Sequence, residues 1–364
     1  MRALVIGGTG PTGPQLVHGL EGRGYTVTIL HTGRHEVEGM SPSVEHVHTD
    51  PFDVTKVADA LGSRTFDVVY AMYGRLRDLA PYFVGRCGHF LAVGGVPVYR
   101  GYAEPWVNDP PGMRVPTRED AARASDADNV KVQRITESED RVFSLHPDAT
   151  TFRYPQIYGP GQLIPREWII VRRILDGRRR VIVADGGLSL RTTGYGPNVG
   201  HALTLAAGAD VARGKAYNVG DEHLLTAGET IAVIAGALGA ELEQVSLPAE
   251  LATPARPFLC ADSPRHVVTG VDAIIADLGY RDLLPAPAAI AATTRWLVDN
   301  PVERGSFTEQ RLQDPFDYAA EDRIIDAYRR ATADVAAMAA AYDPEYRDRY
   351  APGSDDWRLV PPRS

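Results

Sequence analysis

The chain has 364 residues, of which 44% are hydrophobic and 23% charged, and its formal net charge is −9. This is ordinary globular composition, and the acidic balance argues against a nucleic-acid-binding surface. No apolar run approaches the roughly 20 residues that a membrane span needs, and the first one is too short for a secretory leader. Two cysteines provide neither a disulfide framework nor a metal quartet. We therefore expect a soluble, cytoplasmic protein with no membrane or nucleic-acid partner.

A glycine-rich loop follows the first apolar run directly. Residues 2–6 predict a strand, 7–13 read Gly-Gly-Thr-Gly-Pro-Thr-Gly, and 15–20 begin an amphipathic helix. Glycines permit a tight turn and a close backbone approach to phosphates, and the N-terminus of the helix favours an anion. This strand–loop–helix context predicts a dinucleotide pyrophosphate site. The alternative is an ordinary glycine-rich turn.

Strands and helices alternate through the first half of the chain, which predicts a parallel, doubly wound sheet. The expected strands are 25–30, 44–48, 67–72, 89–93 and 151–154, and the expected helices are 54–61 and 132–145. The segment 96–127 has little periodicity and is interpreted as a long active-site loop.

Shorter elements separated by turns make up the second half. We expect helices at 168–175 and 229–238, strands at 180–184 and 216–220, and a long Ala-rich helix at 321–342. The change of pattern after residue 160 indicates a smaller substrate lobe.

Several motifs follow the glycine loop in order. They are Asp50 after the third predicted strand, Ala-Met-Tyr-Gly at 71–74, Val-Tyr at 98–99, Arg-Tyr-Pro-Gln-Ile-Tyr-Gly-Pro at 153–160, Tyr-Asn-Val-Gly at 217–220 and Leu-Gly-Tyr at 278–280. Over about residues 1–300 the chain resembles the extended short-chain dehydrogenase/reductase superfamily, in its NAD-dependent epimerase/dehydratase branch. The residues after 305 match nothing in that family.

The resemblance implies an α/β fold, with a Rossmann-type doubly wound parallel sheet and a smaller C-terminal substrate lobe. We expect an NAD(P)-binding domain at 1–160 with returning elements at about 190–225, a substrate-binding lobe at 161–304, and a helical C-terminal extension at 305–364. The resemblance also implies a small-molecule substrate and a homodimer.

The second predicted strand ends in Leu-His-Thr-Gly-Arg at 30–34, without the acid that usually grips the ribose of NAD. The guanidinium of Arg34 could instead meet a 2′-phosphate, the alternative being a solvated arginine. We therefore expect NADP rather than NAD. The cofactor contacts that the motifs imply are Gly7, Thr9, Gly10, Pro11, Thr12, Gly13, Arg34, Asp50, Pro51, Met72 and Tyr158.

Members of this superfamily normally use a Tyr-x-x-x-Lys pair with a serine, the lysine lowering the pKa of the tyrosine. None of the three lysines here has a tyrosine four residues before it, and Gly95 replaces the serine. Lys131 stands near the usual tyrosine position and Ile135 near that of the lysine. Lys131 either serves the site or lies in solvent at a helix start. Tyr73 and Tyr99 are the candidate acids, although Tyr99 could instead be structural.

Two weaker signals concern other ligands. His46 and His48 are two residues apart, so their side chains share one face of a predicted strand close to Asp50. No third ligand is evident nearby. We therefore expect solvent-facing histidines and no metal site. Arg191 stands where many sugar-nucleotide enzymes of this family approach their substrate, although Arg-Thr-Thr is not a specific motif.

These features leave three functional hypotheses. The first is an NADP-dependent oxidoreductase of atypical short-chain type, acting on a carbonyl, an alcohol or an activated alkene. The second is a sugar-nucleotide epimerase or dehydratase, which the resemblance supports and the missing Tyr-x-x-x-Lys pair opposes. The third is a non-catalytic NADP-binding sensor or scaffold.

Overall fold

The structure is a computed structural model that describes residues 1–344 except 35, 38, 73–74, 126–128 and 263. The chain divides into two compact units, Met1–Phe316 and Asp317–Ser364. No helix in the described part is both long and apolar enough to cross a membrane.

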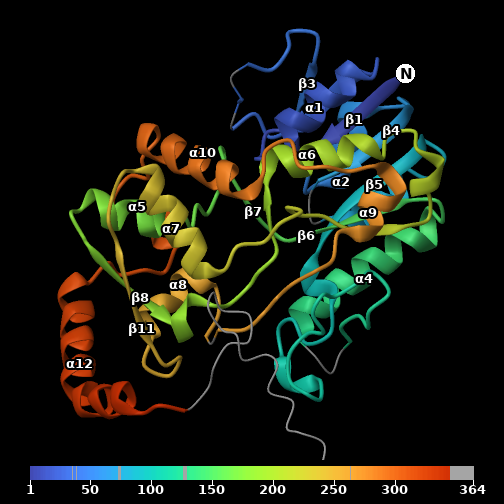
Figure 1. Cartoon of the computed structure of the whole chain (residues 1–364). Helices are drawn as coiled ribbons and strands as arrows, with labels where there is room; N and C mark the ends of the chain where they lie inside the picture. The colour runs from blue at the N-terminus through green and yellow to red at the C-terminus, as the bar shows by residue number, and fades with distance from the viewer. Residues whose placement is uncertain (35, 38, 73–74, 126–128, 263, 345–364) are drawn as a thin grey trace, which may run out of the picture. The chain divides into compact units, whose positions relative to one another are not determined.

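A seven-stranded parallel sheet forms the centre of the first unit (Figure 1), with the strand order β10-β6-β5-β4-β1-β2-β3. Its strands are β1 (Arg2–Ile6), β2 (Thr26–His31), β3 (Glu45–His48), β4 (Phe66–Ala71), β5 (Cys87–Gly95), β6 (Thr150–Tyr154) and β10 (Ala216–Asn218). The order 3-2-1-4-5-6 is that of a doubly wound dinucleotide-binding sheet. The predicted fold class is therefore confirmed.

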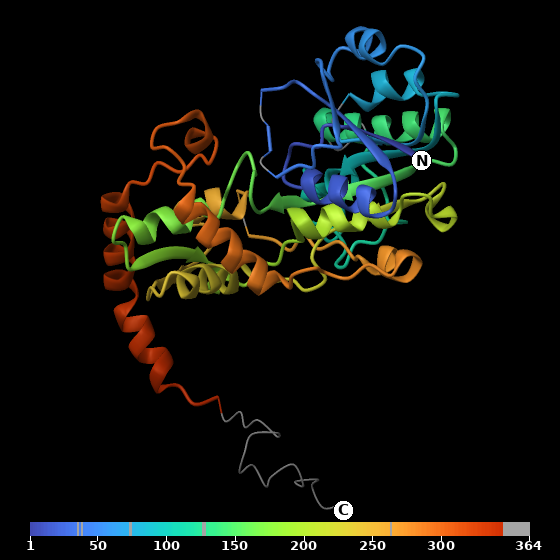
Figure 2. The same cartoon turned by 90° about the horizontal axis from the view of Figure 1, so that it is seen from above.

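Helices cover both faces of this sheet, as Figures 1 and 2 show. One face carries α1 (Gly13–Gly22), α6 (Gly196–Leu205) and α9 (Asp272–Leu278), and the other carries α2 (Val54–Leu61), α3 (Leu76–Tyr82) and α4 (Val130–Leu145). Successive residues of a strand point to opposite faces, so Val5 enters the first core and Leu4 the second.

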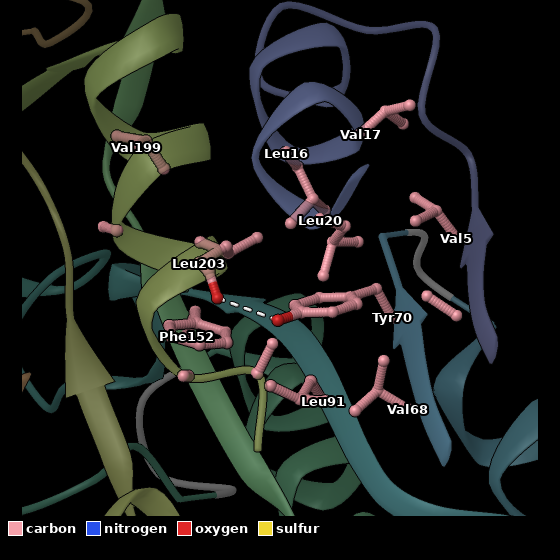
Figure 3. Close-up of a cluster of buried hydrophobic side chains, with 14 of the residues drawn as sticks. Val5, Leu16, Val17, Leu20, Val68, Tyr70, Leu91, Phe152, Val199 and Leu203 are labelled. Carbon is pink, nitrogen blue, oxygen red and sulfur yellow. Dashed lines mark hydrogen bonds between the residues drawn. The ribbon is translucent and has the colours of Figure 1, made fainter. Parts of the chain in front are cut away.

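Figure 3 shows the first of these cores, where the apolar faces of α1 and α6 meet the sheet. Leu16 and Leu20 of α1 and Val199 of α6 are buried there. Tyr70 lies among them, and its hydroxyl donates a hydrogen bond of 2.8 Å to the carbonyl of Leu203. This bond satisfies the only polar atom of a fully buried side chain.

The second half of the first unit builds a smaller lobe around a third hydrophobic cluster. Two parallel strand pairs contribute, β8 (Arg180–Ala184) with β11 (Glu243–Leu247) and β7 (Gln156–Tyr158) with β9 (Thr193–Tyr195). Its helices are α5 (Trp168–Leu175), α7 (Ala227–Ala237), α8 (Arg256–Leu259), α10 (Ala286–Asp299) and α11 (Phe307–Gln310).

The described part of the second unit, 317–344, contains one long helix, α12 (Tyr318–Ala341). Asp317 caps it, since its carboxylate accepts a 3.0 Å hydrogen bond from the N–H of Ala320. This helix confirms the one expected at 321–342.

Candidate active site

The glycine loop between β1 and α1 is shaped by positions that only glycine can occupy. Gly7 and Gly8 have φ angles of +108° and +89°, which glycine alone adopts readily. The N–H of Gly7 donates to the carbonyl of Leu30 at 2.8 Å. A Cβ on Gly13 would lie 2.2 Å from the carbonyl oxygen of Gly8. The first turn of α1 therefore sits directly against the loop.

Helix α6 closes the loop from behind. A Cβ at Gly196 would lie 2.4 Å from the carbonyl oxygen of Pro11, and one at Gly200 would lie 2.4 Å from that of Thr12. In front, a Cβ at Gly10 would meet no heavy atom within 4 Å. The loop is thus held rigidly on one side and open on the other.

Among the described residues, no side chain caps the N-terminus of α1. Thr12 is the N-cap residue but makes no side-chain capping hydrogen bond. Its hydroxyl instead accepts from the hydroxyl of Tyr154, at 3.3 Å. Within the first turn, Gly13 donates its N–H to the carbonyl of Gly10 at 3.0 Å and Pro14 has no N–H. The helix dipole, rather than a row of free N–H groups, is therefore what suits a bound anion here.

Four of the other predicted cofactor residues follow strand ends at the same edge of the sheet, whereas Tyr158 lies in β7 of the smaller lobe. Met72 follows β4, and its N–H donates to the carbonyl of Ile6 at 3.0 Å. Asp50 follows β3 and accepts a 2.9 Å hydrogen bond from the N–H of Phe52, while Pro51 is buried. Arg34 lies beyond the end of β2 and is exposed. That these residues contact a dinucleotide stays a prediction.

Tyr99, a predicted acid, has a buried hydroxyl with two protein partners. The side chain is 1% exposed. Its hydroxyl donates to Asn218 Oδ1 at 2.6 Å and accepts from Arg153 Nη1 at 2.8 Å. Burial raises its pKa, outweighing the opposing effect of Arg153. These contacts favour a structural role for Tyr99, because its hydroxyl proton is already donated to Asn218.

Arg153 in turn is held by a buried carboxylate. Its Nη2 lies 2.7 Å from Glu139 Oε1 and its Nε 3.0 Å from Glu139 Oε2. This bidentate pair joins β6 to α4, with both side chains about 4–5% exposed. Burial lowers the pKa of Arg153, but the hydrogen bonds and charge of Glu139 outweigh it and the net shift is upward.

Helix α4 carries Lys131 and Ile135 at the positions nearest those of the usual tyrosine and lysine. Lys131 is exposed, and its backbone N–H donates to the capping side chain of Asn129 at 3.0 Å. Ile135 packs against Val96 and Val98. The other predicted acid, Tyr73, lies outside the described residues.

A cavity of about 460 Å³ lies beside this helix and the end of β5. Met72, Gly94, Gly95, Arg134 and Ile135 contribute to its lining. Arg134 brings a cation to this cavity from one turn beyond Lys131, and the sequence reasoning did not single it out.

A second cavity, in the smaller lobe, has charged walls. Arg166, Glu167, Arg191, His223 and Arg265 line it together with Tyr158. Burial and then the charge of Arg191 lower the pKa of Arg265, so two guanidinium groups lie near each other. Burial also raises the pKa of Glu167 to about 7, and Glu167 Oε2 has no hydrogen-bond partner among the described residues. Of these residues, the sequence analysis named only Arg191 and Tyr158.

The expectation that no third ligand lies near His46 and His48 is wrong. One potential ligand atom from each of His31, Glu36, His46 and His48 lies within 4.8 Å of the others. Parallel pairing places His31 of β2 opposite His48 of β3, and the connection between the strands brings in Glu36. Strand register, which the sequence alone does not give, assembles this cluster.

No family model matches the sequence, and a search of curated proteins finds no match. Solved structures do match the fold. The dTDP-glucose 4,6-dehydratase of Bacillus anthracis, in complex with NAD, has a TM-score of 0.61 and 16% identity, over 82% of this chain and 97% of that one. WbmH of Bordetella bronchiseptica, in complex with NAD⁺, has a TM-score of 0.64 and 17% identity, over 83% and 99%.

DesIV of Streptomyces venezuelae, a dTDP-glucose 4,6-dehydratase with NAD and TYD bound, gives a TM-score of 0.60 and 20% identity, over 82% of this chain and 98% of that one. At these identities the likeness concerns the fold. The chain therefore has the fold of the NAD-dependent epimerase/dehydratase enzymes of the extended short-chain dehydrogenase/reductase family, as its ordered motifs predicted.

Proposed function

We propose that this chain is a nicotinamide-dependent enzyme that acts on a sugar nucleotide or a similar phosphate-bearing small molecule. The observation that carries the proposal is the glycine loop: closed behind by α6, open at Gly10, and set against the uncapped N-terminus of α1. A dinucleotide pyrophosphate is the ligand that such a loop suits best.

NADP is the cofactor that we propose, rather than NAD. The fold matches were solved with NAD, which supports a nicotinamide dinucleotide. In this chain, however, His31 stands at the tip of β2 where NAD-binding sheets carry an acid, and the exposed Arg34 follows three residues later. A guanidinium there would pair with a 2′-phosphate.

The charged cavity of the smaller lobe supports a phosphate-bearing substrate. Arg191 and Arg265 repel each other there, and a diphosphate would relieve that repulsion through charge-assisted hydrogen bonds. A structure of MoeE5 in complex with UDP-glucose and NAD matches this fold, with a TM-score of 0.62 and 17% identity over 82% of this chain and 99% of that one. We therefore favour a nucleotide-linked sugar as the substrate.

The lost Tyr-x-x-x-Lys pair favours a second candidate, direct reduction of a carbonyl or an activated alkene by NADPH. Epimerases and dehydratases of this fold begin by oxidising the substrate, which needs a strong base, whereas reduction needs only a proton donor. Lys131 and Tyr73 stay our proposed donors. A non-catalytic NADP sensor also accords with the loss of the pair.

The first experiment titrates the purified protein with NADPH and NADH, following fluorescence and thermal stability. We expect NADPH to bind more tightly, and Arg34→Ala to weaken NADPH binding by about tenfold or more while leaving NADH unchanged. Arg295→Ala, an exposed arginine of α10, is the matched control. If neither nucleotide binds, the oxidoreductase proposal fails.

Incubation of the cofactor-loaded protein with UDP- and dTDP-sugars then separates the candidates. An epimerase or dehydratase changes the sugar while the bound cofactor returns to its starting redox state. A reductase consumes one NADPH for each product formed. Binding of cofactor and sugar nucleotide without either reaction would support a sensor.

A further inference from the structure

We propose that His31, Glu36, His46 and His48 form a binding site for a divalent transition-metal cation such as Zn²⁺. The cluster lies at the carboxyl ends of β2 and β3, with Glu36 contributed by the connection between these strands. Imidazole nitrogens with one carboxylate suit Zn²⁺, Co²⁺ or Ni²⁺, whereas Mg²⁺ and Ca²⁺ prefer oxygen ligands.

The spacing of the ligand atoms is close to that of a tetrahedral site. His31 Nε2 lies 3.1 Å from His46 Nδ1, which is 3.3 Å from Glu36 Oε2. His48 Nε2 lies 3.1 Å from Glu36 Oε1, and His31 Nε2 lies 4.0 Å from the same oxygen. Ligands about 2.0–2.1 Å from a tetrahedral zinc ion are about 3.3–3.4 Å apart. Since all four candidate ligand atoms lie within 4.8 Å of one another, small rotations of the exposed Glu36 and His48 side chains would complete the site.

The ring protons satisfy only part of these contacts. His31 Nδ1 accepts a 3.3 Å hydrogen bond from the N–H of Gly33, so the ring carries its proton on Nε2 and directs it at His46 Nδ1. The lone pair of His46 then faces the carboxylate of Glu36. Protonating His46 Nδ1 instead sets two N–H groups against each other. A cation at the centre attracts all four ligand atoms.

Binding a cation would move the His31 proton to Nδ1, and we expect the long contact with Gly33 to open in response. The side chains of His48 and Glu36 are 54% and 52% exposed, which gives the ion a path from solvent.

Such an ion would fasten the connection at 32–44 to the edge of the sheet. β3 is the last strand of the sheet, and edge strands have fewer partners to hold them. The site uses no residue of the glycine loop. His31 also stands at the tip of β2, where the ribose of the proposed cofactor would lie, and Arg34 belongs to the same connection. The two proposals are therefore separated by their readouts: Zn²⁺ binding in the absence of nucleotide tests the metal site, and NADPH binding by the zinc-free chain tests the cofactor site.

The test is a titration of the tag-free, chelator-treated full chain with Zn²⁺ alone by calorimetry. We expect one ion per chain with a Kd on the order of 1 μM or below, and a melting temperature raised by the ion. Co²⁺ should give the intense visible absorption of a tetrahedral complex, and Mg²⁺ should not bind.

His48→Gln and Glu36→Gln should weaken Zn²⁺ binding by at least about 10–100-fold, and both side chains are exposed enough for the variants to fold. His18→Ala, an exposed histidine of α1, is the control and should bind as the parent does. Absence of saturable Zn²⁺ binding by the parent chain, or equal binding by the His48 and Glu36 variants, would overturn the proposal.

Discussion

Replacing Glu139 by glutamine should destabilise the first unit strongly. Glu139 accepts two hydrogen bonds from Arg153 at 2.7 and 3.0 Å, a third from Arg123 at 3.1 Å and a fourth from Thr151 at 3.4 Å. Removing its charge leaves Arg153, which is 3% exposed, with no carboxylate partner. Breaking a buried pair by removing one partner costs about 3–5 kcal/mol. At roughly 2 °C per kcal/mol for a unit of this size, Tm should fall by about 6–10 °C.

Thermal and urea unfolding of the parent and the variant measure this cost. Glu137→Gln is the matched control, because Glu137 lies on the same helix and pairs with Arg77 where both side chains are nearly half exposed. Exposed pairs contribute about 0–1 kcal/mol. Equal losses of stability in the two variants would refute the claim that burial makes the Glu139 pair indispensable.

Three further substitutions test the rest of the structure. Gly13→Ala should weaken NADPH and NADH binding by at least about tenfold in a titration, because the new Cβ would collide with the Gly8 carbonyl. The control is Gly22→Ala on the same helix, whose Cβ would meet no heavy atom within 4 Å and which should bind both nucleotides as the parent does. Tyr70→Phe should cost about 1 kcal/mol in urea unfolding, since the Leu203 carbonyl loses one of its donors. Burial raises the pKa of Glu167 from 4.5 to about 7, so the folded state binds a proton that the unfolded chain has released, and stability falls as pH rises through this window. Glu167→Gln carries no ionisable group at this position, so its stability does not fall in this way. The free energy of unfolding of the variant minus that of the parent should rise by up to about 3 kcal/mol between pH 5 and pH 8. If this difference is the same at both pH values, the pKa of Glu167 is not raised.

Most strands and helices of the first half could be predicted closely because their apolar runs end at turn residues. Helix α3 was not predicted, since it has seven residues and contains Pro81, and so short a segment with an internal proline shows little helical pattern. Helix α6 was missed for a physical reason. It begins with Gly196 and contains Gly200, residues that weaken a helical pattern, yet both must be glycine to let α6 approach the carbonyls of Pro11 and Thr12. Strands β7 and β9 have three residues each, too few to show an alternating pattern.

The candidate sites differ in how far the sequence reveals them. The glycine loop is continuous in sequence, so its spacing alone indicates its chemistry. Arg191 and Arg265 come together only because Arg191 forms a parallel bridge with Val267. Of the histidine cluster, the sequence shows only that His46 and His48 share a strand face. The register of β2 against β3 is what places His31 beside them.

Helix α4 shows how this chain departs from the enzymes whose fold it shares. The positions nearest the usual tyrosine and lysine hold Lys131, exposed at the helix start, and Ile135, packed on Val96 and Val98. The buried charged residue of this helix is Glu139, which contributes to the lining of the 460 Å³ cavity but has its carboxylate held by Arg153. Because the carboxylate of Glu139 is engaged, we propose that proton transfer comes from the exposed first turn of α4 or from the ends of the strands. In this proposal Lys131 and Tyr73 are the candidate proton donors, and their roles stay predictions.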